Sequence, residues 1–255
     1  MSLLNIIEAP SANFNERLHP LDMLVLHYTG MPDGPSALAR MQENKEPRVS
    51  AHYMVEEDGR IFRLVPEEKR AWQAGRSSWQ GQDDLNSRSI GIEIVNPGHE
   101  WGYRPFPDPQ IVSVIALCKG ILSRWPIPQR RIVAHSDIAP ARKEDPGELF
   151  PWKRLSEEGI GLWPGKTRPE PWMMHNVSLG DAGVTVERLQ ADLATIGYTV
   201  PSHGKFDEET AAVVRAFQRR WRQSRVSGEG DPETVSAVHE VARLTQADTQ
   251  QTLEP

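Results

Sequence analysis

The sequence predicts an α/β domain, with a mixed central β-sheet flanked by helices, followed by a small all-α domain. Before residue 165, apolar stretches of strand length alternate with helical patterns, whereas 185–244 contains helical patterns alone. The segment 163–172 between them carries three prolines, a composition typical of a linker. We therefore expect an α/β domain at 1–165, a linker at 166–177, a helical domain at 178–245 and a polar, disordered tail at 246–255.

Three segments of the first domain are predicted to be strands. MLVLHYTG at 23–30 and RIVAH at 131–135 are largely apolar runs, as expected of buried strands. In SIGIEIVNPG, residues 89–98, the isoleucines occupy every second position. Because successive side chains of a strand point to opposite faces, Glu93 is expected on the face opposite the isoleucines.

A hairpin and a long helix complete the first domain. Asp58-Gly59 separates two apolar stretches within 51–66, a pattern typical of a tight hairpin turn. Apolar residues recur at helical spacing through 108–126, until a proline ends the pattern. Cys118 lies on this apolar stripe, so we expect it to be buried as a small hydrophobic residue.

The second domain is predicted to contain three helices. TVERLQADLATIGY at 185–198 has apolar residues at helical spacing. The helices expected within 206–221 and 230–244 have Asp207 and Asp231 as N-cap candidates, because an aspartate can accept a hydrogen bond from the first turn. Both helix starts share the pattern D-x-E-T-x-x-x-V, a weak internal repeat.

Composition excludes several classes of protein. A formal net charge of −6 argues against a general nucleic-acid binder, because such proteins present a basic face. We interpret the arginine-rich end of the 206–221 helix as a solvent-exposed face. The arginines concerned are Arg215, Arg219, Arg220, Arg222 and Arg225. One cysteine permits no internal disulfide and excludes a cysteine-rich metal site.

The N-terminal sequence and the hydrophobicity pattern bear on location. Residues 1–20 show no basic start, long apolar run or cleavage site of a signal peptide. No stretch reaches the roughly 18 apolar residues of a membrane span. We expect a cytoplasmic protein, and the alternative is a periplasmic or cell-envelope protein whose signal was removed. We also expect a monomer that binds no nucleic acid.

Polar side chains at the ends of the predicted strands can supply catalytic chemistry. His27 and Glu93 lie at two strand ends, and a loop broken by two prolines carries His135 and Asp145 after a third. Strand ends on one side of a sheet can converge although they are far apart in sequence. Two imidazoles and one carboxylate fill three positions of a catalytic zinc site and leave the fourth for water. The same set also suits non-haem iron.

The first domain contains the motifs LHYTG, SAHYMVEEDGRIFRLVPEEKRAWQAGRSSW, NSRSIGIEIVN and AHSDIAPARKEDPG, in this order. Over roughly residues 20–155 the chain resembles the AmpD-like zinc amidases, which are N-acetylmuramoyl-L-alanine amidases related to peptidoglycan recognition proteins. The resemblance implies the fold of that family and a Zn²⁺ cofactor. It also implies hydrolysis of the amide between the lactyl group of muramic acid and the L-alanine of the stem peptide, in peptidoglycan or muropeptides.

The resemblance also implies roles for individual residues. The zinc ligands would be His27, His135 and Asp145. Glu93 would take a proton from the attacking water and pass one to the leaving amine. Lys143 would help zinc to stabilise the oxyanion of the tetrahedral intermediate. The alternative for Lys143 is a surface lysine paired with Glu144 or Glu148.

Further residues near these motifs are candidates for substrate binding. Where many relatives have a histidine in an AWHAG-like stretch, this sequence has Gln73, which can form hydrogen bonds but carries no charge. His52 is expected either to line the cleft or to pack beside Tyr53. Aromatic residues near a cleft often form only its wall. The predicted substrate-binding residues are His52, Trp72, Gln73, Trp79 and Asn96.

The second domain contains the motifs VERLQADLATIGY, GKFDEETAAVVRAFQ and VSGEGDPETVSAV. Over about 178–244 it resembles the three-helix peptidoglycan-binding domain found beside many cell-wall hydrolases, and the alternative is a generic helical bundle. Tethering an enzyme to a polymeric substrate raises its effective concentration there. We therefore expect a zinc amidase joined to a wall-binding domain, with peptidoglycan or its fragments as the partner.

The sequence leaves two other functions open. The first is a non-catalytic peptidoglycan-recognition protein of the same fold, although such proteins usually lack part of the ligand set that is complete here. The second is a metal hydrolase that acts on another amide, such as a peptide cross-link. A serine or cysteine hydrolase is disfavoured, because Cys118 lies on an apolar helix face and no nucleophile–histidine pairing is evident.

Overall fold

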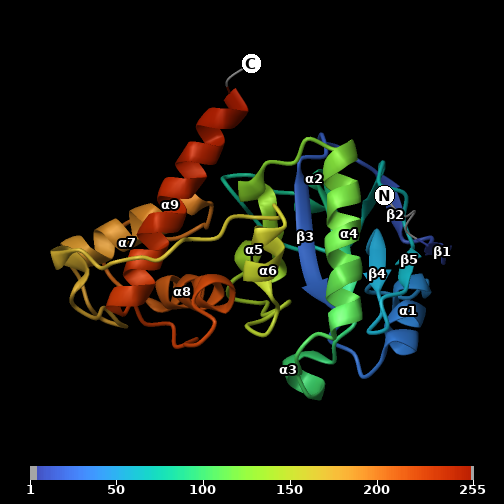
Figure 1. Cartoon of the computed structure of the whole chain (residues 1–255), viewed down its shortest axis with the longest axis horizontal. Helices are drawn as coiled ribbons and strands as arrows, with labels where there is room; N and C mark the ends of the chain where they lie inside the picture. The colour runs from blue at the N-terminus through green and yellow to red at the C-terminus, as the bar shows by residue number, and fades with distance from the viewer. Residues whose placement is uncertain (1–4, 254–255) are drawn as a thin grey trace.

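The computed structural model describes residues 5–253, in which an α/β part and a helical part lie side by side (Figure 1). Within the described residues, a six-stranded mixed sheet has the order β1-β5-β4-β7-β3-β8. Its strands are β1 (Ile6–Glu8), β3 (Met23–Tyr28), β4 (Tyr53–Val55), β5 (Ile61–Arg63), β7 (Ser89–Ile94) and β8 (Ile132–Ala134). β2 (Phe14–Glu16) and β6 (Lys69–Ala71) pair separately. β4 and β5 form the predicted antiparallel hairpin, and the predicted α/β class is confirmed.

Parallel pairing brings the ends of three strands together. β3 lies between β7 and β8 and runs parallel to both, so their carboxyl ends lie at one edge of the sheet. His27 of β3 is the register partner of Glu93 of β7. Leu26, one residue earlier, pairs with Ala134 of β8, and His135 follows directly. The topology therefore places two histidines and a glutamate on neighbouring strand ends.

Helix α4 (Asp108–Arg124) covers one face of the sheet (Figure 1). Leu24 and Leu26 of β3 and the isoleucines of β7 pack in one buried cluster with the apolar side of α4. Cys118 belongs to this cluster and is buried, as predicted. Because His27 and Glu93 alternate with these apolar residues, their side chains point from the opposite face.

Short helices and turns connect the strands of the α/β part. They are α1 (Gly34–Gln42), α2 (Leu85–Arg88), α3 (Gly98–Trp101), η1 (Gln129–Arg131), α5 (His135–Ile138), α6 (Trp152–Glu157) and η2 (Pro171–Met173). In Figure 1, α5 and α6 lie between β3 and the helical part. Among residues 5–253, no helix combines the length and the apolar composition needed to cross a membrane.

The helical part contains the three predicted helices. They are α7 (Val184–Ile196), α8 (Glu208–Trp221) and α9 (Pro232–Leu253). Asp207 accepts a hydrogen bond from the backbone N–H of Thr210 at 2.8 Å, and Asp231 accepts one from Thr234 at 2.7 Å. Both predicted N-caps are therefore confirmed, and each satisfies a backbone donor that the first helical turn leaves free.

The C-terminal segment corrects a prediction. Residues 246–253, expected to be disordered, continue helix α9, while residues 254 and 255 lie outside the described part of the chain. Asp248 in this segment pairs with Arg130 of η1 at 2.8 Å. The same guanidinium donates to the main-chain oxygen of Asp248 at 3.1 Å. This contact with the α/β part stabilises a segment whose own composition is too polar to indicate order.

The helical part and the α/β part share a hydrophobic core. Trp79, Val133 and Ile138 of the α/β part belong to the same buried cluster as Leu193 of α7 and Phe217 of α8. The segment with linker composition therefore joins two parts that are packed against each other. Burying apolar surface between them stabilises the whole chain.

Two arginines of α8 lie at this interface, which corrects the prediction of a solvent-exposed face. Arg220 is buried and pairs with Asp137 of α5 at 2.7 Å. Arg219 pairs with Glu144. The prediction holds for Arg225, which is exposed. The error arose because α8 packs against α5, a contact that the local sequence does not indicate.

Candidate active site

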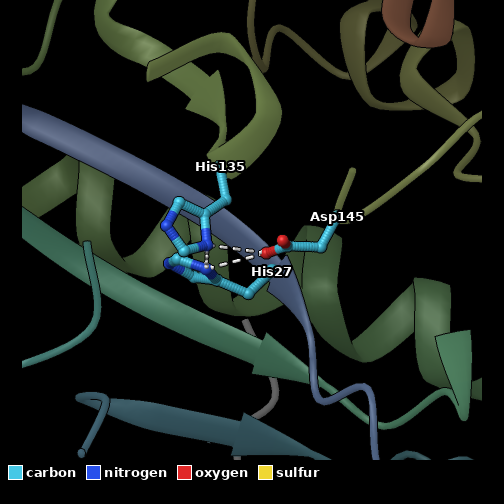
Figure 2. Close-up of side chains that lie close together, drawn as sticks. All are labelled: His27, His135 and Asp145. Atoms are coloured by element: carbon cyan, nitrogen blue, oxygen red, sulfur yellow. Dashed lines mark hydrogen bonds and ion pairs between the residues drawn. The ribbon is translucent and has the colours of Figure 1, made fainter. Parts of the chain in front are cut away.

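His27, His135 and Asp145 lie together at the carboxyl edge of the sheet, and all three are buried. His27 Nδ1 lies 2.9 Å from His135 Nδ1 and 3.0 Å from Asp145 Oδ2. His135 Nδ1 lies 2.9 Å from the same carboxylate oxygen. Figure 2 shows that the two imidazoles and the carboxylate point toward one another. One atom of each residue is therefore directed at a common centre.

The second nitrogen of each imidazole identifies the atom that faces this centre. His27 Nε2 contacts the side-chain oxygen of Gln73, and His135 Nε2 lies 3.1 Å from the main-chain oxygen of Ala74. Because an amide oxygen can only accept, we assign the ring hydrogen to Nε2 and the free lone pair to Nδ1 in both residues. Two nitrogen lone pairs and a carboxylate oxygen at these distances fit a divalent metal ion.

Asp145 is held in its charged form. Burial alone would raise the pKa of Asp145, but positive charge facing the carboxylate, carried by the imidazoles of His135 and His27 when no metal ion is bound, holds it well below its ordinary value. A bound metal cation would act in the same direction. The backbone N–H of Ser136 donates to the main-chain oxygen of Asp145 at 2.9 Å. The proline-broken loop is thus tied back to the start of α5, which brings its carboxylate to the two histidines.

Gln73 contacts a proposed ligand, a role that the sequence did not indicate, and its contact with substrate stays a prediction. Although Gln73 lines the cavity, its side-chain oxygen contacts His27 and its Nε2 donates to Ser89 Oγ at 2.7 Å. Its backbone N–H donates to Asn86 Oδ1 at 2.9 Å. Gly91 provides the space, since a Cβ there would lie 2.6 Å from Gln73 Cγ. Gln73 therefore orients the imidazole of His27.

Glu93 faces the same cavity as His135 and Asp145. Its Oε2 is buried and has no hydrogen-bond partner among residues 5–253. Burial raises the pKa of Glu93 to about 7, although His27 and Lys143 oppose this rise. A carboxyl group with such a pKa can take up and return a proton near neutral pH.

Lys143 also lines the cavity. Glu144 and Glu148, which the sequence offered as ion-pair partners of Lys143, form ion pairs with other residues. Glu144 pairs with Arg219, and Glu148 pairs with His99 at 3.2 Å. The ammonium group of Lys143 is therefore available to a negative charge that develops in the cavity.

An open cavity of about 420 Å³ lies beside this cluster and is lined in part by His135 and Asp145. Trp72 lines it, and its contact with substrate stays a prediction. Other lining residues were not singled out in the sequence; they include Tyr28, Ser50, Glu100 and Arg142. Ser50 and Arg142 come from irregular segments and Glu100 from the short helix α3, none of which shows a regular pattern in the sequence. Only Tyr28, next to His27 at the end of β3, had a position that could have indicated it.

His52 lies away from the cavity, and its predicted contact with substrate is corrected. It is fully buried, and its Nδ1 accepts the backbone N–H of Gly91 at 3.0 Å. Its Nε2 lies 3.0 Å from the main-chain oxygen of Lys69. Burial, with Arg17 beside the ring, lowers the pKa of His52 to about 3, so the ring is neutral. His52 therefore holds strands and loops of the fold together.

Trp79 and Asn96 also lie outside the cavity. Trp79 is 1% exposed, and its ring centroid lies 4.9 Å from that of Tyr198 in the helical part. The buried side chain of Asn96 donates to the main-chain oxygen of Arg104 at 2.7 Å and accepts the N–H of Gly98 at 3.0 Å. Both side chains stabilise the fold, so their predicted contacts with substrate are corrected.

Comparison with known families accounts for both parts of the chain. Residues 17–148 match the family of N-acetylmuramoyl-L-alanine amidases called Amidase_2. The chain belongs to this amidase family. Residues 182–238 match a peptidoglycan binding domain. The resemblances proposed for the two parts from the sequence are therefore confirmed.

Two members of the family show how far the sequence similarity extends along the chain. The N-acetylmuramoyl-L-alanine amidase AmiD of Escherichia coli strain K12 is 38% identical over 84% of this chain and 79% of its own length. The 1,6-anhydro-N-acetylmuramyl-L-alanine amidase AmpD of Haemophilus influenzae is 36% identical over 56% of this chain and 86% of its own length. The similarity to AmiD thus extends beyond the α/β part of this amidase family member.

Solved structures show the same arrangement of the chain. The complex of AmiD from E. coli with anhydro-N-acetylmuramic acid-L-Ala-D-γ-Glu-L-Lys has a TM-score of 0.76 and 36% identity, covering 88% of this chain and 89% of AmiD. AmpDh3 from Pseudomonas aeruginosa has a TM-score of 0.75 and 32% identity, covering 88% and 92% of the two chains. Both matches span most of the described chain, so the likeness includes residues of the helical part.

Proposed function

We propose that the protein is a zinc-dependent N-acetylmuramoyl-L-alanine amidase. It would hydrolyse the amide between the lactyl group of muramic acid and the L-alanine of the stem peptide. The observation that carries this proposal is the convergence of His27, His135 and Asp145 at an open cavity that Glu93, His135 and Asp145 line. Membership of the amidase family supports it, as does the 38% identity to AmiD, which is named for this activity.

The proposed ligand atoms are His27 Nδ1, His135 Nδ1 and Asp145 Oδ2. Two imidazoles and one carboxylate are a recurrent ligand set of catalytic zinc, and they leave a position open for solvent. When bound, zinc would activate a water molecule and polarise the carbonyl group of the scissile amide. The contacts at both Nε2 atoms keep the rings oriented for this purpose.

Glu93 and Lys143 would act on the substrate directly. The unpartnered Oε2 of Glu93 is placed to accept the proton that the attacking water loses. Because burial raises the pKa of Glu93 to about 7, the carboxyl group can then return this proton to the leaving amine. The Lys143 ammonium would stabilise the negative charge that develops on the amide oxygen.

The test is hydrolysis of anhydro-N-acetylmuramic acid-L-Ala-D-γ-Glu-L-Lys, the substrate named in the AmiD complex. We expect mass spectrometry to show release of the intact tripeptide. Activity should be lost when a chelator removes the metal and should return when zinc is added. Undiminished cleavage by metal-stripped protein would refute the zinc mechanism. Cleavage within the peptide would favour a different amidase, and binding without turnover would favour a recognition protein.

The helical part and the expected location lead to two proposals about the natural substrate. A cytoplasmic protein would meet soluble muropeptides, whereas a cell-envelope protein would meet intact peptidoglycan. The match of residues 182–238 to a peptidoglycan binding domain supports the polymer. Rates on purified peptidoglycan sacculi and on the soluble anhydro-muropeptide would decide between them, and co-sedimentation with sacculi would test binding by the helical part.

A further inference from the structure

Helix α8 packs against the loop 135–145, whose first and last residues are the proposed metal ligands His135 and Asp145. Two successive arginines of α8, Arg219 and Arg220, reach this loop near its two ends. The helical part therefore contacts the segment that supplies two of the three ligands. Because a ligand's position depends on the backbone that carries it, this contact bears directly on the metal site.

Arg220 makes the buried contact. Its Nη1 donates to Asp137 Oδ2 at 2.7 Å, and its Nη2 donates to the main-chain oxygen of Ile132 at 2.8 Å. These two acceptors lie on either side of the first ligand in the chain. The guanidinium also lies 4.2 Å from the ring centres of Trp152 and Trp221, which hold it between two aromatic faces. Arg220 of α8 thus forms hydrogen bonds with both β8 and α5.

Asp137 is the centre of this network. Besides the guanidinium, it accepts the hydroxyl of Tyr198 at 2.5 Å and the backbone N–H of Ala134 at 2.9 Å. The side chains of Arg220 and Asp137 are only 3% and 0% exposed. Removing one partner leaves a buried charge without compensation, so the surrounding backbone must shift or admit water. The start of α5, which carries His135, therefore depends on the helical part.

The second contact lies at the other end of the loop. Arg219, whose side chain is 11% exposed, pairs with Glu144, the residue before Asp145. The hydrogen bond from the backbone N–H of Ser136 to the main-chain oxygen of Asp145, at 2.9 Å, joins the two ends of the loop. A displacement of α5 would therefore be passed to both ligands.

We propose that Arg220, together with Asp137 and Tyr198, positions the metal site, so that the helical part holds His135 and Asp145 in the geometry that binds metal. This inference rests on the proposed function, since it requires that the site binds a metal ion. It gives the helical part a role in addition to binding peptidoglycan. An interface with a purely structural role would change the unfolding temperature without changing the metal geometry.

The test measures metal binding in the full-length chain. We would compare Tyr198→Phe and Arg220→Met with wild type by zinc affinity from chelator competition, and by the visible absorption of the Co²⁺-loaded protein, which reports coordination geometry. Asp248→Asn is the matched control, because it removes the ion pair with Arg130 at the same interface without contacting the ligand loop. All measurements are made well below the unfolding temperature of each metal-free variant.

We expect zinc affinity to fall about 10-fold or more in Tyr198→Phe and Arg220→Met, with an altered Co²⁺ spectrum. Asp248→Asn should lower the unfolding temperature but keep the affinity and spectrum of wild type. The inference is wrong if Tyr198→Phe, which removes a single hydroxyl, and every folded Arg220 variant bind both metals as wild type does. A wild-type protein that binds no zinc would instead overturn the proposed function, and the inference with it.

Discussion

His27 and His135 each direct one ring nitrogen to the common centre and give the other to a fixed acceptor. For His135 the acceptor is the main-chain oxygen of Ala74, which any residue at that position would supply. For His27 the acceptor is the side chain of Gln73, which a substitution can remove. The orientation of the proposed ligand His27 therefore depends on the residue type at position 73, whereas that of His135 does not depend on the residue type at position 74.

Gln73→Leu should weaken zinc binding by about 10- to 100-fold, the usual effect of losing a partner that orients a metal ligand. Leucine keeps much of the volume but accepts no hydrogen bond, so the His27 ring is free to turn. Chelator competition measures the effect, with Trp72→Phe as the control, because Trp72 lines the cavity without contacting a ligand. Equal affinities in Gln73→Leu and wild type would contradict the orienting role.

Glu93→Gln should lower the rate of lactyl-amide cleavage by about 10²- to 10⁴-fold, the typical contribution of a general acid–base residue. The amide of glutamine fills the same space but cannot take up the proton. Zinc affinity should stay close to that of wild type, because Glu93 is not a proposed ligand. Glu68→Gln, at an exposed position, is the matched control. Retention of most activity in Glu93→Gln would assign the base elsewhere.

The sequence predicts the location of some site residues correctly and that of others wrongly. His27, Glu93 and His135 lie at strand ends, and the rule that parallel strand ends converge is enough to bring them together. The surroundings of His52 and Trp79 depend on residues far away in the chain, Arg17 and Tyr198 among them. No local pattern shows such a partner. Trp79 was therefore wrongly expected in the cleft, and of the two positions expected for His52 the one in the cleft was wrong.

At the level of helices and turns, two buried glutamines explain the internal repeat of the helical part. Gln190 of α7 donates to Thr210 Oγ1 at 2.9 Å, and Gln218 of α8 donates to Thr234 Oγ1 at 3.2 Å. Each glutamine also accepts a backbone N–H from the turn before the next helix. The repeated threonines are thus joined to the preceding helix, which gives the repeat a structural reason.

Glu67 joins the hairpin to the C-terminal end of α4. Its carboxylate accepts the hydroxyl of Tyr53 at 2.8 Å, Arg124 Nη2 at 2.6 Å and the indole N–H of Trp125 at 2.6 Å. Burial alone would raise the pKa of Glu67, but these hydrogen bonds outweigh it and lower the pKa below its ordinary value of 4.5. The charged form therefore stabilises the folded state.

Glu67→Gln should lower the free energy of unfolding by about 1.5–3 kcal/mol at pH 7, the usual worth of hydrogen bonds to a charged group. A lowered folded-state pKa contributes stability above the ordinary value of 4.5, and this contribution is lost as pH falls below it. The difference between wild type and variant should therefore shrink between pH 6 and pH 3. Urea unfolding of metal-free protein measures it, and a difference independent of pH would contradict the assignment.

Hairpin and helix starts are predicted well because their causes are local. The Asp58-Gly59 turn and the caps at Asp207 and Asp231 each depend on a few neighbouring residues. The continuation of α9 through residues 246–253 depends instead on a residue far away in the chain, because Asp248 pairs with Arg130 of η1. The tail was therefore wrongly expected to be disordered.

At the scale of the whole molecule, the hydrophobic core shared by the two parts means that they do not behave as independent domains. The composition of 163–172 indicates a linker, because prolines are common in segments that connect helices and strands. Composition does not show whether the connected parts pack together. Here apolar residues of both parts form one buried cluster, and the buried ion pair of Arg220 with Asp137 crosses the interface. A freely tethered wall-binding module does not describe this arrangement.

A chain ending at residue 165 should be much less stable than the full-length protein. It would expose Val133 and Ile138 to water and leave the buried carboxylate of Asp137 without Arg220. We expect a lower unfolding temperature, binding of a hydrophobic dye and a tendency to aggregate, measured by calorimetry and light scattering. A truncated chain that is monomeric and as stable as the full-length protein would contradict the shared core.

Gly91 carries no reactive group and does not line the cavity, yet the proposed metal site constrains which residue can stand there. A single added methyl group would occupy the volume of Gln73 Cγ, only 2.6 Å away, and would push the amide off the His27 ring. A mutagenesis screen confined to chemically reactive side chains would overlook this position. For the orientation of the imidazole proposed to bind the metal, Gly91, the smallest residue of β7, therefore matters as much as Glu93 does for the proposed proton transfer.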